Sequence, residues 1–223
     1  MVELTRRTVL IAGATSTSGL AAARALTSAG ARVVAVGHDP QKLEGLGAAV
    51  PGIRTEVCDL SDENDVQRLA DRIHETRPVD GVLHLVGGWR GGGGLAAQSD
   101  ADYRFLERSF TALRYVTRVF DADLRASDAG RLAVVSSTTV ARPLAGGANY
   151  TAMKAATEAW TRAVAQGFAK AARDAGEPLR AASVIFRVAA LDGLEERLAA
   201  TFVELWAADA AGINDTIVDL SAG

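Results

Sequence analysis

The sequence predicts an α/β protein with a doubly wound, seven-stranded, mostly parallel sheet and helices on both faces. Short runs of β-branched and apolar residues alternate along the whole chain with longer segments of helical periodicity. The short runs are continuously apolar, which is typical of strands buried on both faces of a parallel sheet. Right-handed crossovers through the intervening helices then wind the sheet in both directions.

Seven apolar runs between turn signals are the predicted strands. The first, TVLIAGA, is rich in β-branched residues and contains a glycine near its end, whereas the third, IRTEVCD, has a weaker pattern. Strands are therefore expected at residues 8–14, 32–37, 53–59, 80–87, 131–137, 179–186 and 215–221.

The segments between these strands carry helix signals. Gly30 and Gly176 follow periodic segments, at the position where glycine commonly ends a helix. Ser61 is expected to cap the second helix. Helices are predicted at residues 18–30, 62–76, 100–127, 149–176 and 194–212.

Composition and charge exclude several classes of protein. The chain has 223 residues, 48% of them hydrophobic, and no linker or internal repeat, so we expect one domain over residues 1–223. Its formal net charge of −3 lacks the electrostatic footprint of a nucleic-acid-binding protein. The apolar run at residues 9–12 is shorter than the h-region of a signal peptide, and no window reaches the length of a membrane span. We expect a cytoplasmic protein with neither nucleic acid nor membrane as a partner.

Cysteine and histidine usage argues against a metal site. Cys58 is the only cysteine and falls in a predicted strand, where a buried, inert thiol is expected. The three histidines, His38, His74 and His84, are spread apart and lack metal-site spacing. We therefore expect no catalytic metal.

The loop after the first predicted strand has the features of a phosphate site. Ligands of doubly wound sheets bind beyond the carboxyl ends of the strands. Gly13 allows a tight turn, and the helix that begins near Ser18 and Gly19 directs N–H groups and a positive dipole end at this place. A dinucleotide pyrophosphate is therefore expected here, although an ordinary strand-to-helix turn remains an alternative. Hydroxyl donors are expected from Thr15, Ser16, Thr17 and Ser18.

The ends of the second and third predicted strands bear on the choice of cofactor. An acidic side chain at the end of strand two often binds the ribose 2′-OH of NAD. Gly37 stands there instead and His38 can contact a 2′-phosphate, which favours NADP(H) over NAD(H), although Asp39 argues the other way. Asp59, followed by Leu60 in the expected cofactor site, either accepts a hydrogen bond from an adenine amino group or belongs to the next helix cap.

Three residues form a pattern suited to carbonyl reduction. Tyr150 and Lys154 are one helical turn apart on one face of a predicted helix, and Ser137 ends the fifth strand thirteen residues before Tyr150. A tyrosine can donate the proton that the carbonyl oxygen needs, and a lysine nearby is expected to lower its pKa from about 10 to about 8. Ser137 can donate a hydrogen bond to the substrate oxygen as charge develops there.

These motifs together resemble the short-chain dehydrogenase/reductase family over essentially the whole chain. The resemblance implies a Rossmann-type domain that transfers hydride between a nicotinamide cofactor and a small carbonyl or alcohol substrate. It implies that Ser137, Tyr150 and Lys154 are catalytic, that Lys154 also binds the nicotinamide ribose, and that Asp59 contacts adenine. Tyr150 and Lys154 thus belong to both the catalytic and the cofactor-binding sets.

The chain departs from the family pattern at several positions. Thr17 stands where the phosphate loop usually has its middle glycine. Ser109 stands where the family has a helical asparagine that helps to hold a proton-relay water, so it is a candidate for that catalytic role. Residues 84–87, His-Leu-Val-Gly, replace Asn-Asn-Ala-Gly, and Phe186-Arg187 replaces Pro-Gly after strand six.

The stretch VGGWRGGGG, residues 86–94, raises the question of a second phosphate loop. It lacks the Lys-Ser/Thr of a P-loop. The family pattern puts the end of strand four beside the nicotinamide ribose and substrate, so Val86, Gly87 and Gly88 are expected to contact the cofactor. The glycines at 91–94 are expected to form a mobile flap.

Trp89 either stacks on a flat substrate or anchors its loop, and Trp89, Ser137 and Val188 are the expected substrate contacts. The Gly-Gly-Trp stretch with its following glycines is similar to dihydropteridine reductases, which also have Ser for the helical Asn.

Other functions and an assembly state follow as expectations. Reduction of an imine-like pterin ring and a cofactor-binding sensor without turnover stay open. A methyltransferase is disfavoured, because that class usually has an acidic residue where Gly37 ends strand two. The helices at 100–127 and 149–174 carry more apolar surface than one sheet face needs, and the family pairs them across a two-fold axis. A homodimer or homotetramer is therefore expected.

Overall fold

The seven strands form one sheet in which every neighbouring pair is parallel. The computed structural model describes residues 2–221, and the strand order is β3-β2-β1-β4-β5-β6-β7. The predicted α/β fold class is confirmed, with a wholly parallel sheet where a mostly parallel one was expected. The strands are β1 (Thr8–Ala12), β2 (Arg32–Gly37), β3 (Arg54–Val57), β4 (Gly81–His84), β5 (Arg131–Ser137), β6 (Ala182–Val188) and β7 (Thr216–Asp219).

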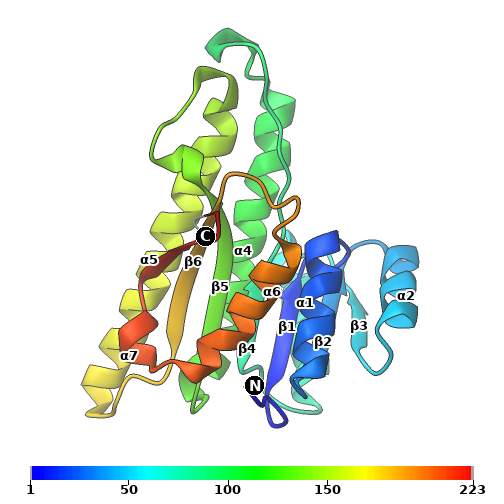
Figure 1. Cartoon of the computed structure of the whole chain (residues 1–223), viewed down its shortest axis with the longest axis vertical. Helices are drawn as coiled ribbons and strands as arrows, with labels where there is room; N and C mark the ends of the chain where they lie inside the picture. Colours follow the sequence, from blue (N-terminus) through cyan, green and yellow to red (C-terminus); the bar gives the residue numbers. More distant parts are fainter. Residues whose placement is uncertain (1, 222–223) are drawn as a thin grey trace.

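Helices cover both faces of this sheet, as Figure 1 shows for α1 and α6 on the near face and the long α4 and α5 behind it. The N- and C-terminal halves wind outward from β1 and β4 in opposite directions, because the chain reverses its direction of travel across the sheet after β3. The helices are α1 (Thr17–Ser28), α2 (Pro40–Ala49), α3 (Glu63–His74), α4 (Asp100–Ala126), α5 (Ala148–Ala175), α6 (Glu195–Glu204) and α7 (Ala210–Ile213).

Two buried apolar layers hold the helices to the sheet. On one face, Leu26 of α1 and Phe202 of α6 pack over side chains such as Ile11. On the other face, Phe120 of α4 and Phe168 of α5 pack over the alternate strand residues. Strand residues that point to opposite faces are both buried, which explains why the strands are continuously apolar in sequence.

Three local predictions need correction. The helix α2 was not predicted, although Asp39 caps it through bonds from the N–H groups of Gln41 and Lys42 (3.0 and 3.1 Å), with Pro40 in the first turn. Asp62 rather than Ser61 caps α3, since its carboxylate accepts from the Asp65 N–H.

The third correction concerns the segment predicted as one helix at 194–212. Its helix α6 ends at Glu204 and continues as a single 3₁₀ turn, Leu205–Ala207. Extended backbone at Ala208 and Asp209 separates this turn from α7.

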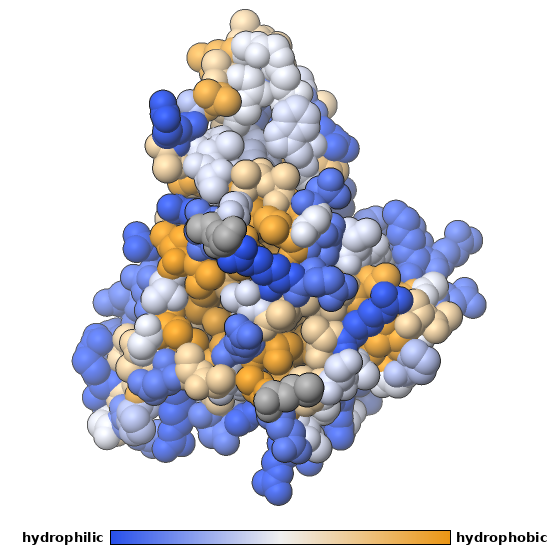
Figure 2. Space-filling model, in the orientation of Figure 1, coloured by the Kyte–Doolittle hydropathy of each residue, from blue (hydrophilic) through white to orange (hydrophobic). Residues whose placement is uncertain are grey.

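Large exposed hydrophobic side chains are sparse on the two long helices. In residues 2–221, those on α4 and α5 amount to Phe105 alone. Figure 2 shows pale and orange residues at the tip of the molecule and orange areas over its body. Trp89, Leu95 and Leu144, which are also exposed, lie in the loops after β4 and β5. The homo-oligomer stays a prediction. Within the same described residues, no helix combines the length and apolarity that crossing a membrane requires.

Candidate active site

The loop after β1 is shaped by glycines that tolerate no side chain. Gly13 has a φ of +82°, and a Cβ there would lie 2.8 Å from the backbone nitrogen of Val86. A Cβ on Gly19 would lie 2.0 Å from the carbonyl oxygen of Ala14. The start of α1 can therefore approach the loop closely enough to direct its backbone N–H groups across the end of β1.

The four hydroxyl residues of this loop have different roles. Ser16 caps α1, its Oγ accepting from the Gly19 N–H at 3.1 Å. Ser18 is buried, and the exposed Thr17 donates to Glu195 of α6 at 3.5 Å, so it turns away from the loop's centre. Thr15 and Ser16 line the cavity described below, whereas Thr17, Ser18 and Gly19 do not.

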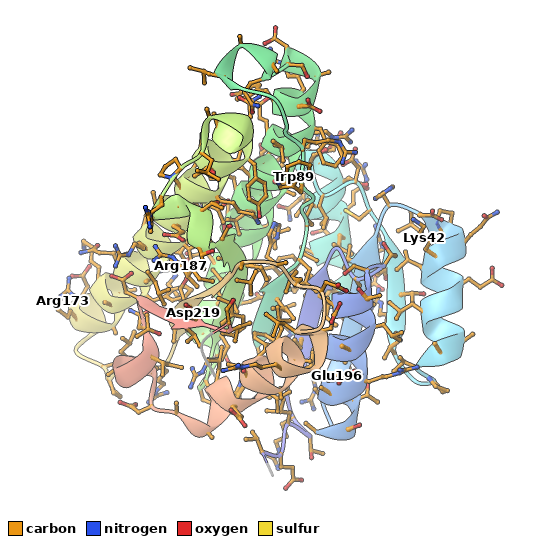
Figure 3. All side chains as sticks on the ribbon, turned by 45° about the horizontal axis from the view of Figure 1, so that its top comes forward. Lys42, Trp89, Arg173, Arg187, Glu196 and Asp219 are labelled. Carbon is orange, nitrogen blue, oxygen red and sulfur yellow. The ribbon has the colours of Figure 1, made fainter. Side chains whose placement is uncertain are left out.

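After β2, the side chains that line the site are His38 and Lys42. Gly37 is packed against Thr15, whose Cγ2 would be 2.9 Å from a Cβ at position 37. His38 and Lys42 line the cavity, and Lys42 lies on α2, where Figure 3 labels it. The carboxylate of Asp39 is engaged as the α2 cap. Lys42 went unnoticed in the sequence because α2 itself did, although the Asp-Pro pair before it is a helix-start signal.

Asp59, two residues after the end of β3, is held by hydrogen bonds from Ser61 and Arg108. Its Oδ1 accepts from the N–H and the hydroxyl of Ser61 at 2.9 and 2.6 Å, and Arg108 of α4 binds its Oδ2 at 3.2 Å. The pKa of Asp59 is lowered. The hydrogen bond from the Ser61 hydroxyl has the largest effect, the Ser61 N–H and Arg108 act in the same direction, and burial opposes them. Asp59 therefore stays an anionic acceptor, and it does not cap α3.

A cavity of about 640 Å³ runs along this edge of the sheet, within the size range of small-molecule sites. It brings together most of the predicted cofactor residues and adds several that the sequence did not single out. The predicted residues in its lining are Gly13, Thr15, Ser16, Gly37, His38, Asp59, Leu60, Val86, Gly87, Gly88 and Ser109, and the additional ones include Lys42, Ser61, Leu85, Phe105 and Arg108.

The lining fits a nicotinamide dinucleotide. The glycines of the first loop let backbone N–H groups come close to a pyrophosphate, and Asp59 can accept from an adenine amino group. Leu60 and Val86 supply apolar surface, and the Asp39 carboxylate after β2 is bonded to the α2 backbone and is not in the cavity lining. Cys58, also in the lining, is 2% exposed, and burial raises the pKa of its thiol to about 12, so it is the inert thiol that we expected.

Ser137 lies at the end of β5 and is oriented by its neighbours. Its hydroxyl oxygen accepts from the N–H and the Oγ1–H of Thr139 at 3.2 and 2.9 Å, and Thr151 donates to Thr139 at 3.2 Å. The Ser137 hydroxyl also interacts with the phenol of Tyr150. The backbone bridge from Ser137 to Val188 places the predicted substrate residue Val188 beside it in the sheet.

Tyr150 and Lys154 approach one another on α5, but their pKa values move differently from the prediction. The Lys154 Nζ is 5.7 Å from the centre of the Tyr150 ring and donates to the Val135 carbonyl oxygen at 2.8 Å. Burial raises the pKa of Tyr150, against the opposing effect of Ser137, and burial lowers the pKa of Lys154 to about 8. The expected phenol pKa near 8 is therefore wrong. Lys154 titrates in that range instead, because desolvation of its ammonium outweighs the effect of the Glu158 carboxylate.

A partly buried ion pair lies one helical turn beyond Lys154. Glu158, one turn after Lys154 and 7% exposed, accepts from Ser136 Oγ at 2.7 Å and from Arg187 Nε and Nη2 at 2.8 and 2.6 Å. Burial of Glu158 opposes ionisation, but the bonds from Arg187 and Ser136 prevail and lower its pKa. Arg187 pairs in register with Asp219, beside which Figure 3 shows it. Arg187, which departs from the family pattern, thus links β6 to α5, and Ser136 links β5 to the same carboxylate.

The loop after β4 is packed at its start and exposed at its centre. A Cβ on Gly88 would lie 3.0 Å from the Phe105 ring, and the Arg90 guanidinium sits 3.9 Å from the centre of that ring. Trp89 is 60% exposed on the loop that Figure 3 shows above the sheet, so its side chain does not anchor the loop in a core.

The glycines that we expected to form a mobile flap are bonded to the loop after β5. The Gly92 N–H donates to the Gly146 carbonyl oxygen at 2.8 Å. Gln98 donates to the same oxygen at 3.0 Å and accepts from the Asn149 N–H at 3.2 Å. The two loops therefore meet beside the N-terminus of α5, one residue from Tyr150.

Ser109 lines the cavity with its hydroxyl bonded inside its own helix, and its role in holding a water stays a prediction. Its hydroxyl donates to the Leu106 carbonyl oxygen within α4 at 2.6 Å. Its own carbonyl oxygen is 3.3 Å from Nε2 of His84, the last residue of β4. Sequence reasoning assigned no role to His84, which is 4% exposed and does not belong to the cavity lining.

The comparisons with known proteins agree with this geometry. The family model for short chain dehydrogenases matches residues 7–172, which run from the start of the sheet into α5. The nodulation protein G of Rhizobium sp. (strain N33) is 32% identical over 174 residues, or 76% of this chain and 70% of that protein.

Solved structures share the fold over nearly the whole length. A short chain dehydrogenase from Escherichia coli CFT073 has a TM-score of 0.86 at 22% identity and covers 97% of this chain and 96% of its own. Another, from Shigella flexneri 2a strain 301 in complex with NADP, has a TM-score of 0.83 at 20% identity and covers 98% of both chains. With the matching family model and relative, they place this chain in the NAD(P)-dependent short-chain dehydrogenase/reductase family of oxidoreductases.

Proposed function

We propose that this protein is an NADPH-dependent reductase of small carbonyl compounds, with Tyr150 as the proton donor. The observation that carries the proposal is that Ser137, Tyr150 and Lys154 lie together next to the cavity: the Lys154 Nζ is 5.7 Å from the centre of the Tyr150 ring and would lie 3.8 Å from a Cβ on Gly87, a lining residue. The reaction forms a C–H bond from hydride and an O–H bond from a proton, and a carbonyl becomes an alcohol. The nicotinamide cofactor, when bound, supplies the hydride.

The chain's own groups handle the proton and the developing charge. A phenol whose pKa is raised stays protonated at neutral pH, which suits a donor to the carbonyl oxygen. Ser137, held by Thr139, can donate its hydroxyl hydrogen to the same oxygen as negative charge develops. The Lys154 ammonium stabilises the phenolate that remains, and it can bind the nicotinamide ribose.

The preference for NADPH rests on the charges at the end of β2. His38 and Lys42 are exposed at the cavity, and the nearby carboxylate of Asp39 is held by two backbone N–H groups of α2. The one acidic residue that counted against a 2′-phosphate in the sequence is therefore committed to a helix cap. The Lys42 ammonium and the hydrogen-bonding imidazole of His38, both in the cavity lining with Gly37, support recognition of the 2′-phosphate.

A substrate panel with NADPH and with NADH tests the proposal. Carbonyl compounds of increasing size are mixed with each cofactor, and the absorbance of the reduced nicotinamide is followed. We expect oxidation of NADPH by at least one aldehyde or ketone, with a lower rate from NADH. Equal or tighter binding of NADH would contradict the reading of His38 and Lys42.

Imine reduction is a second candidate, supported by the aromatic surface at the loop after β4. Trp89 is 60% exposed and Phe105 41% exposed, so a flat heterocycle has two rings to stack on. Cyclic imines in the same panel test it, since their reduction depends less on a phenolic proton. Binding of NADPH without turnover of any carbonyl or imine would favour a cofactor sensor.

A further inference from the structure

The buried imidazole of His84 is a titratable group near the active site that the proposed mechanism leaves without a role. His84 ends β4, next in register to Ala12 at the end of β1 and to Val134 of β5. Burial lowers the pKa of its imidazole to about 3, with the positive charge of Lys154 acting in the same direction. The ring is therefore neutral over the working range of the protein.

The hydrogen bond of the ring defines which nitrogen carries the proton. Nε2 lies 3.3 Å from the Ser109 carbonyl oxygen, and a carbonyl oxygen can only accept. In a neutral ring with the proton on Nε2, Nδ1 has a lone pair and no hydrogen. This Nδ1 is buried and has no hydrogen-bond partner among the described residues. A buried acceptor without a donor costs about 1–3 kcal/mol, so its retention needs a reason.

The candidate donor for the His84 Nδ1 is the ammonium of Lys154. Among residues 2–221, its hydrogen bond is to the Val135 carbonyl oxygen, which uses one of three N–H groups. The chain beyond His84 runs past this ammonium, since a Cβ on Gly87 would lie 3.8 Å from the Lys154 Nζ. The charge of Lys154 reaches His84, although no direct bond joins them. A buried acceptor and a nearby charged donor with N–H groups to spare can be joined by a single bridging water.

We propose that His84 is a positioning residue whose Nδ1 accepts a hydrogen bond from a buried water that in turn accepts from the Lys154 ammonium. This proposal rests on the proposed roles of Tyr150 and Lys154. The bridge keeps the ammonium turned toward the phenol and the cofactor ribose. Because the imidazole stays neutral, His84 acts as a permanent acceptor and does not itself transfer a proton.

Two amide variants separate this role from a merely structural one. In His84→Asn, the side-chain oxygen can take the place of Nδ1, while the donor to Ser109 is lost. In His84→Gln, the side-chain NH₂ can take the place of Nε2–H, while the Nδ1 acceptor is lost. Both are neutral amides in the same pocket, so thermal unfolding of each variant provides the control for folding.

The kinetic test compares kcat for carbonyl reduction in these variants. We expect His84→Gln to lower kcat about tenfold or more, the effect of one lost hydrogen bond to a charged group. We expect His84→Asn to keep most of the wild-type kcat. If the bond to Ser109 were what matters, the order would be reversed. That reversed order, or an equal effect of both variants, overturns the proposal.

A second measurement does not need a substrate. NADPH binding is followed by fluorescence between pH 6 and 10, where its midpoint reports the titration of Lys154 near pH 8. The charged groups of this region are Lys154 and Glu158 on α5 and Arg187 on β6, with Tyr150 as the remaining titratable neighbour. We expect a lower midpoint in His84→Gln and an unchanged one in His84→Asn. Equal midpoints overturn the proposal, whereas absence of any turnover in wild type counts against the proposed function alone.

Discussion

The two sides of the carboxyl-terminal edge of the sheet differ in how deeply their polar side chains lie. On the nucleotide side, at the ends of β1, β2 and β3, His38, Lys42 and Asp59 are exposed to solvent. On the reaction side, Ser137 at the end of β5, His84 at the end of β4 and Glu158 on α5 are 1%, 4% and 7% exposed, and Tyr150 and Lys154 are partly buried.

This difference separates binding from chemistry. Exposed charges remain hydrated and can meet a charged ligand at small cost, but solvent screens their effect on one another. Enclosed groups lose hydration, so their pKa values shift and each depends on its partner, as for Lys154 and Glu158. Substitutions on the reaction side should therefore change rate or stability strongly, and those on the nucleotide side should change affinity moderately.

The largest expected effect is on the reaction side. Tyr150→Phe removes the phenolic OH while it keeps the ring, and proton donation by a positioned side chain is worth roughly 10²–10⁴ in rate. We expect kcat for carbonyl reduction to fall by about that factor, with an unchanged Kd for NADPH by fluorescence titration. Tyr115→Phe on α4 is the matched control. A Tyr150→Phe protein that keeps most of its carbonyl activity would remove the mechanism and favour imine reduction.

Breaking the partly buried ion pair should affect stability first. Arg187→Ala leaves the Glu158 carboxylate without its charged hydrogen-bond partner, which costs about 2 kcal/mol in the free energy of unfolding at neutral pH. The native pKa of Glu158 is lowered, so its contribution is present above about pH 4.3 and is lost as the pH falls through the native value.

Urea unfolding at pH 7 and in acid measures this effect. The difference between wild type and Arg187→Ala should shrink in acid as Glu158 becomes protonated. Arg125→Ala removes an exposed pair on α4 with Asp121 and should cost about 0.5 kcal/mol or less. Equal costs of the two variants would contradict the contrast between buried and exposed pairs.

Cofactor affinity should depend on pH through the reaction side. The Lys154 ammonium is present below a pKa of about 8 and lost above it, so NADPH binding should weaken as the pH rises through this value. A charged hydrogen bond is worth about 1.5–3 kcal/mol, which corresponds to about tenfold or more in Kd. Tyr150→Phe should keep the pH dependence and Lys154→Arg, whose guanidinium stays charged, should lose it. A step that disappears in Tyr150→Phe would assign the titration to the phenol.

The smallest expected effect is on the nucleotide side. Lys42→Ala should weaken NADPH binding about fivefold, since an exposed ion pair contributes up to about 1 kcal/mol, and should leave NADH binding unchanged. The effect should decline with added salt. Lys170→Ala, an exposed lysine on α5 paired with Asp174, serves as the control. Equal losses for NADPH and NADH would mean that Lys42 does not bind the 2′-phosphate.

Local signals were sufficient for much of the fold. Helix α4 was expected at 100–127 and spans Asp100–Ala126, because Ser99 caps it and its apolar residues recur at helical spacing. The one missed helix, α2, has no acidic residue in its first turn and only two buried side chains, so its apolar pattern is weak. The break near Ala208 was also missed, because alanines on both sides read as a continuous helix.

The sequence by itself determined the elements of the site: the glycines that the first loop requires, and Tyr150 and Lys154 one turn apart on one helix. These depend on residues close together in the chain. Only the tertiary structure decided the direction of the Tyr150 pKa, the pairing of Arg187 with Glu158, and the position of His84 behind Lys154. Each of these depends on burial by strands and helices far apart in sequence, and desolvation by distant segments leaves no local pattern to read.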